Sequence, residues 1–98
     1  MFTWTEEKNQ INRKKHGLFL SEITDVFGDP HLIEFYDKAH STMEEERYIC
    51  FGRWQDLIVL SVVFTEKDGQ IHLITAREAT PKERHIYEEN YRKETSRN

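Results

Sequence analysis

The spacing of hydrophobic residues changes about a third of the way along the chain. Between residues 20 and 27, Leu20, Ile23, Val26 and Phe27 recur every three or four positions, which is the spacing of a helix. From residue 31 to residue 77 the apolar positions alternate or run together and are rich in β-branched and aromatic residues, which is typical of strands. The pattern therefore predicts helices followed by a sheet.

Two helices are predicted before this sheet, after a short alternating strand at Phe2 to Trp4. Thr5 is suited to cap the first helix, with acidic residues in the first turn, where they meet the positive helix end. Gly17 is suited to end it in a left-handed conformation. The second helix, Leu20 to Phe27, should end at Gly28-Asp29-Pro30, because proline cannot continue a helix.

Four strands are predicted next: His31 to Asp37, Arg47 to Arg53, Leu57 to Thr65 and Gln70 to Arg77. The third is apolar on both faces, so we expect it at the centre of the sheet. Asp68-Gly69 predicts a tight turn before the fourth strand. The loop from Lys38 to Glu46 is long for a hairpin, and long loops are often functional.

A third helix is expected to begin at Thr80, with Pro81 in its first turn and Glu83 completing a capping box. Residues 94–98 look like a frayed tail. The chain should then form a single α+β domain over residues 1–98, with a short strand, two helices, a four-stranded antiparallel meander and a C-terminal helix. We expect the helices to pack on one face of the sheet.

Length and composition narrow the class of protein. The chain has 98 residues, 12% of them aromatic, which is too many for a disordered protein. The only cysteine, Cys50, excludes an internal disulfide. No secretory signal is visible, and the longest apolar run, Leu57 to Phe64, is too short to span a membrane. The expected location is therefore the reducing cytoplasm, away from membranes.

Charge is unevenly distributed along the chain. The net charge is −4, which argues against a protein that binds nucleic acid by bulk electrostatics. Residues 22 to 46 contain eight acidic residues and one base, Lys38. A local cationic site remains open in the second half of the chain, but a broad basic face is not expected.

Most catalytic motifs are absent. The four glycines are not grouped into a phosphate-binding loop, and no serine has the context of a nucleophile elbow. The five histidines form no helical HxxxH pair, and the lone cysteine has no CxxC partner, so no structural zinc is expected. The sequence therefore predicts neither a metal nor an organic cofactor.

A set of cationic and proton-active side chains remains near predicted strand ends. Metal-free RNA cleavage needs such groups, because a base must deprotonate the ribose 2′-hydroxyl while cations stabilise the charged phosphorus centre. Arginine suits the second role, since its planar fork matches phosphate oxygens. Taken singly, each residue is more simply a surface, capping or packing residue. The set comprises Lys38, His40, Arg47, Arg53, Arg77, Lys82, Glu83 and Tyr87.

Along nearly its whole length, from Phe2 to about Tyr91, the chain resembles the BrnT toxin family. The matching features, in order, are Phe2-x-Trp4, Lys8-Asn9, Asn12, Lys15-His16-Gly17, Val26-Phe27-x-Asp29-Pro30, His40-Ser41, Glu45-Glu46-Arg47, Gly52-Arg53, Ile74-Thr75-Ala76-Arg77-x-Ala79-Thr80, Glu83 and Tyr87. The resemblance implies a RelE-like fold and the toxin role of a type II toxin–antitoxin pair. It also implies a ribonuclease without metal or cofactor that inhibits translation and growth. The expected partners are RNA and a BrnA-like antitoxin with a ribbon-helix-helix domain, in a dimer or heterotetramer.

The resemblance also suggests roles for single residues. Arg53 and Arg77 would stabilise the phosphate, Lys38 and His40 would contribute from the loop, and Glu83 or Tyr87 would transfer protons. RNA contacts are expected at Arg47 and Lys82. Two other classes stay open: a non-catalytic protein-binding module or inactive family member, and a DNA-binding regulator, which the acidic second helix disfavours.

Overall fold

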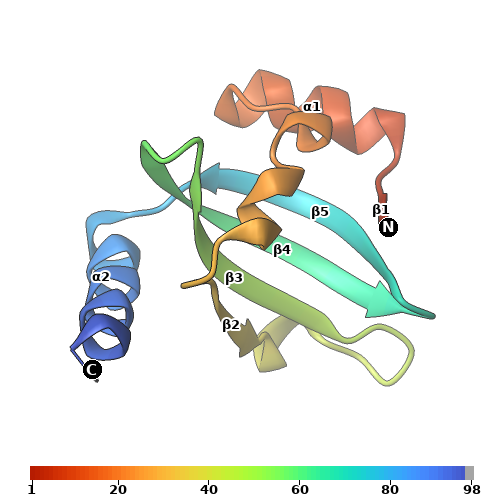
Figure 1. The fold of residues 1–98 in the computed structure, drawn as a ribbon. Coiled ribbons are helices and arrows are strands. Elements are labelled where there is room, and N and C mark those ends of the chain that lie inside the picture. The colour runs from red at the N-terminus through yellow and green to blue at the C-terminus, as the bar shows by residue number, and fades with distance from the viewer. Residues whose placement is uncertain (97–98) are drawn as a thin grey trace.

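A computed structural model describes residues 1–96 of the chain, and residues 97 and 98 lie outside it. The chain folds into a five-stranded sheet with helices and 3₁₀ turns (Figure 1). In order, the elements are β1 (Phe2–Thr3), α1 (Glu6–His16), the 3₁₀ turns η1 (Leu20–Glu22) and η2 (Thr24–Gly28), β2 (Ile33–Tyr36), the 3₁₀ turn η3 (Lys38–His40), β3 (Arg47–Trp54), β4 (Ile58–Lys67), β5 (Gln70–Glu78) and α2 (Pro81–Thr95).

The sheet has the strand order β1-β5-β4-β3-β2. Strands β2 to β5 form an antiparallel meander, and β4 lies between β3 and β5, as the sequence predicted. Strand β1 adds a short parallel edge, where Phe2 and Thr3 pair with Ile71 and His72. The predicted α+β order of elements is confirmed.

Helices cover both faces of the sheet, so the expectation that they share one face is wrong. Cys50, Leu60 and Val62 face a core formed with α1, η1 and η2, whereas their neighbours Phe51 and Val59 pack with α2. Because β3 and β4 are apolar on both sides, each side needs a cover. Figure 1 shows α1 and the 3₁₀ turns on one side and α2 at one end of the sheet. We call the second side the α2 face.

The predicted second helix is replaced by the two 3₁₀ turns η1 and η2. Its apolar residues Leu20, Ile23 and Val26 are fully buried, as the helical spacing suggested. Backbone groups of the residues between them, however, find partners outside the segment: Ser21 N–H donates to Asn9 Oδ1 at 3.2 Å, and Trp54 Nε1 donates to the Glu22 carbonyl at 2.9 Å. Tertiary contacts therefore replace helical hydrogen bonds in this short segment.

Helix α1 is fixed to the sheet by a buried amide. Asn12 Nδ2 donates to the carbonyls of Leu18 and Ala76, both at 2.8 Å, and Asn12 Oδ1 accepts from Ala76 N–H at 3.0 Å. Gly17, with φ of 79°, ends α1 as predicted. The buried residues of α1, Asn9 and Asn12, are polar, so this helix is held to the sheet by hydrogen bonds more than by an apolar face.

Candidate functional site

The strand register places Arg47, Arg53 and Arg77 on the α2 face. Arg53 pairs with Val59 and Arg77 pairs with Ser61, so these two arginines lie in adjacent rows on the two strands that flank β4. Strands are spaced about 4.8 Å apart, which puts β3 and β5 roughly 10 Å from each other. Arg47 lies six residues before Arg53 on β3, about 20 Å away along the strand.

The Arg53 guanidinium packs on two tyrosines of α2. Its Cζ lies 5.8 Å from the ring centre of Tyr87 and 5.7 Å from that of Tyr91. Among the ion pairs found in residues 1–96, none involves Arg53. The side chain of Arg53 is thus positioned by contact with aromatic rings, and no carboxylate in residues 1–96 forms an ion pair with its guanidinium.

Asp29 connects the loop before β2 to both β3 and α2. Its Oδ2 accepts from Tyr87 Oη–H at 2.6 Å and from the backbone N–H of Arg53 at 2.8 Å, while Oδ1 accepts from the backbone N–H of His31 at 2.9 Å. Burial opposes ionisation of Asp29, but these hydrogen bonds outweigh it and hold the pKa of Asp29 below its usual range. Burial and the bond to Asp29 raise the pKa of Tyr87, so its hydroxyl stays protonated and committed to Asp29.

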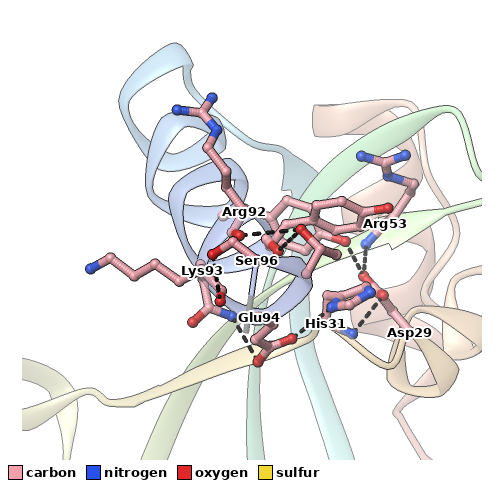
Figure 2. Close-up of polar contacts among 11 residues, drawn as sticks. Asp29, His31, Arg53, Arg92, Lys93, Glu94 and Ser96 are labelled. Carbon is pink, nitrogen blue, oxygen red and sulfur yellow. Dashed lines mark hydrogen bonds and ion pairs between the residues drawn. The ribbon is translucent and has the colours of Figure 1, made fainter. Parts of the chain in front are cut away.

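His31 lies beside this group (Figure 2). Its Nδ1 is 2.6 Å from Glu94 Oε2, and its ring centre is 4.3 Å from that of Tyr91. Tyr87, Tyr91 and Glu94 are spaced four and three residues apart on α2, which places them on one side of the helix. This side of α2 therefore meets Asp29, His31 and Arg53.

Arg77 forms a two-pronged ion pair with Glu83. The two terminal nitrogens of Arg77 lie 2.7 Å and 3.0 Å from the Glu83 carboxylate oxygens, and Glu83 also accepts from Thr80 N–H at 2.8 Å. The hydrogen bond from Arg77 lowers the pKa of Glu83 against the opposing effect of burial. Glu83 is therefore a stable carboxylate that orients Arg77 and caps α2.

The structure brings together five of the eight residues predicted for the site. Arg53, Arg77, Glu83 and Tyr87 all lie where α2 meets the sheet, with Lys82 exposed in the first turn of the helix.

The other three residues lie at the far end of the sheet, around η3 and the start of β3 (Figure 1). There His40 Nδ1 is 3.0 Å from Asp37 Oδ2, Arg47 Nε is 2.7 Å from Glu45 Oε1, and Lys38 is exposed. The structure does not bring Lys38, His40 and Arg47 near Arg53.

Four residues of this region were not singled out from the sequence: Asp29, His31, Tyr91 and Glu94. In the sequence, Asp29 stands only at a predicted helix end and in a family match, and Glu94 stands in a predicted tail, although α2 extends to Thr95. The helical spacing of Tyr87, Tyr91 and Glu94 was the available signal.

Within residues 1–96, no group of three or more His, Cys, Asp or Glu side chains is placed to hold a metal ion. No helix in this range has the length and apolar character needed to cross a membrane.

Comparison with known proteins gives two findings. Residues 4–83 match the family model described as ribonuclease toxin, BrnT, of type II toxin-antitoxin system. The structure is also similar to the crystal structure of the Brucella abortus ribonuclease toxin BrnT, with a TM-score of 0.67 and 28% sequence identity over 82% of this chain and 97% of that one. A search of curated proteins gave no match.

Proposed function

Because the chain belongs to the BrnT family of ribonuclease toxins of type II toxin–antitoxin systems, we propose that it cleaves RNA without a metal ion or organic cofactor and thereby inhibits translation and growth. The reaction would be attack of a ribose 2′-hydroxyl on the adjacent phosphorus. The site would be the part of the α2 face around Arg53.

Arg53 is the observation that supports this proposal most directly. A guanidinium that stacks on aromatic rings and has no carboxylate partner in residues 1–96 keeps its N–H groups available for an anion. It also lines a hollow with Val59 of β4, Arg84 of α2 and the two carboxylates Glu78 and Glu88. Arg84 lies 3.8 Å from Glu88, so Arg53 is the arginine of this hollow that has no carboxylate partner in residues 1–96.

Arg77 has a supporting role in the proposal. Both of its terminal nitrogens already bind Glu83, and one of them also donates to the Glu78 carbonyl at 3.2 Å, so fewer of its N–H groups remain for a ligand. Arg53 should therefore contribute more than Arg77 to stabilising the charged transition state. Lys38, His40 and Arg47, at the far end of the sheet, and Lys82 would contact more distant parts of a longer RNA.

The first prediction tests Arg53 and Arg77. Loss of a charge-assisted phosphate contact in the transition state costs on the order of 3 kcal/mol, or roughly a hundredfold in rate. We expect a loss of this size in Arg53→Ala and a smaller one in Arg77→Ala, and only partial recovery in Arg53→Lys, because lysine lacks the planar fork. The measurement is cleavage of a mixed RNA substrate by the full chain in the presence of a chelator.

Arg92→Ala is the matched control, because Arg92 is also on α2 but is exposed and pairs with Glu89. Circular dichroism would verify that each variant is folded. Equal activity in Arg53→Ala and wild type would refute the site. A wild type that cleaves no RNA, with and without ribosomes, would favour a non-catalytic binding module.

We also propose a BrnA-like antitoxin as partner, bound through the acidic stretch of residues 22–46. The edge strand β2 belongs to this stretch, and Phe35 and Tyr36 on it are 39% and 51% exposed. Glu44, Glu45 and Glu46 follow in an exposed loop with Met43. An edge strand beside acidic and apolar side chains suits a partner segment that is partly basic.

A further inference from the structure

We propose that His31, oriented by Glu94, is the base that deprotonates the ribose 2′-hydroxyl, an inference that rests on the proposed ribonuclease function. His31 is not among the residues predicted for the site from the sequence. The proposal is supported by the contacts of His31 with Glu94, Tyr91 and Asp29.

The contact with Glu94 determines which nitrogen of His31 is free. A carboxylate only accepts hydrogen bonds, so the 2.6 Å contact between Glu94 Oε2 and His31 Nδ1 requires a proton on Nδ1. In the neutral ring, Nε2 then carries the lone pair and can accept a proton. The carboxylate also stabilises the imidazolium formed after proton transfer, as in other histidine–carboxylate pairs.

The ring of His31 is held in place from three directions. Tyr91 packs against it at 4.3 Å, Glu94 binds Nδ1, and Asp29 accepts from the backbone N–H. The side chain is nevertheless 24% exposed, so solvent and a ligand can reach it. A fixed and partly exposed ring suits a general base.

His31 also lies close to the phosphate-binding candidate. The ring of Tyr91 contacts both the imidazole of His31 and the guanidinium of Arg53. The titratable and charged groups around His31 are thus Tyr91 and Glu94 from α2, Asp29 from the preceding loop and Arg53 from β3. Figure 2 shows His31, Glu94, Asp29 and Arg53 gathered where α2 meets the sheet.

The other proton-transfer candidates are less suited to this role. Glu83 is held as a carboxylate of lowered pKa by Arg77, and the hydroxyl of Tyr87 is bound to Asp29. His40 is paired with Asp37 at the far end of the sheet from Arg53. His31 alone among these candidates combines a carboxylate partner with proximity to Arg53.

The reaction step balances without another reagent. His31 Nε2 takes the proton from the 2′-hydroxyl, O2′ forms a bond to phosphorus, and the bond from phosphorus to O5′ breaks. The leaving O5′ takes a proton from solvent water, and the His31 imidazolium returns its proton to solvent. The products are a 2′,3′-cyclic phosphate and a 5′-hydroxyl, while Arg53 stabilises the charge on the phosphoryl oxygens.

The test is chemical rescue in the full chain. General-base catalysis contributes about a hundredfold or more, so His31→Ala should slow cleavage of a defined RNA by at least that factor. Added imidazole should restore activity in proportion to its concentration, because the free base occupies the vacated space. A merely structural role for His31 would not respond to imidazole. Glu94→Gln, which keeps a hydrogen-bond acceptor without the charge, should lose activity to a smaller extent.

His85→Ala is the matched control, since His85 is an exposed histidine on α2 that faces Glu89. His31→Asn keeps a donor for Glu94 but no base, and it serves if His31→Ala does not fold. A wild type without RNA cleavage would overturn the proposed function itself. Cleavage by wild type together with full activity in His31→Asn, or an activity loss in His31→Ala that imidazole leaves unchanged, would overturn only the role of His31.

Discussion

Asp29 accepts hydrogen bonds from three parts of the chain that are far apart in sequence: its own loop, β3 and α2. The same carboxylate therefore ties α2 to the sheet and fixes the backbone of both Arg53 and His31. Its lowered pKa reflects these bonds. Two residues proposed to act on RNA thus depend on one side chain that needs no contact with the RNA.

A second prediction concerns Tyr87→Phe, which removes one hydrogen bond to this carboxylate. At pH 7 the free energy of unfolding should fall by about 1.5–3 kcal/mol, the range for bonds to charged groups. Because the folded-state pKa of Asp29 is lowered, its stabilisation is complete above its unfolded pKa of about 4 and is lost as pH falls through the folded value. The difference in free energy of unfolding between wild type and Tyr87→Phe should therefore become smaller in acid.

Urea unfolding of wild type and Tyr87→Phe at a series of pH values between 7 and 3 would measure this difference in stability. Tyr91→Phe is the control, because no hydrogen bond from the Tyr91 hydroxyl is present in residues 1–96. A difference that is as large at pH 3 as at pH 7 would contradict the assignment to ionised Asp29.

At the scale of elements, β3 and η2 pack so closely that only glycine fits at position 52. A Cβ at Gly52 would lie 2.6 Å from Leu32 Cδ1 and 2.7 Å from Val26 Cγ1. Val26 is fully buried in the core beneath α1 and the 3₁₀ turns, so it cannot move away freely. This close approach positions the Asp29 loop against Arg53, the next residue on β3.

A third prediction follows for Gly52→Ala. Overpacking at this contact should lower the free energy of unfolding by about 1–3 kcal/mol and should reduce any RNA cleavage by displacing Asp29. Chemical denaturation and the cleavage rate would be measured on the same samples. Gly28→Ala is the control, because a Cβ there meets nothing within 4 Å; equal stability of the two variants would disprove the packing explanation.

At the scale of the whole molecule, the sequence predicted the order of elements and the central place of β4, because both depend on local patterns. It did not predict that α2 covers the face opposite α1, since that depends on the direction in which the chain leaves β5. Of the residues predicted for the site, only some lie together in the structure. Arg53, Arg77, Glu83 and Tyr87 cluster, but His31 and Glu94 meet across 63 residues of sequence, and no local pattern reveals such a contact.

The acidic stretch of residues 22–46, proposed as the antitoxin-binding surface, leads to a fourth prediction. If the antitoxin binds there with basic residues, Glu44→Lys combined with Glu46→Lys should weaken the complex by tenfold or more. Binding by wild type should also weaken as salt is raised, because exposed charges are screened. Calorimetry with the product of the adjacent gene would measure both. Glu89→Lys on α2 is the control, and unchanged affinity in the double variant would remove this surface from the interface.

The Asn12 amide has a consequence for solubility. Beyond the two residues that pair with β1, strand β5 is an edge whose peptide groups are open to pairing with another chain. Asn12 occupies both hydrogen-bonding groups of Ala76 on that edge, much as a neighbouring peptide would. The side chain thus ends the sheet where a strand of a second molecule would otherwise add, which is how edges cause aggregation. Asn12 would then keep a strand of a second copy from pairing at this edge.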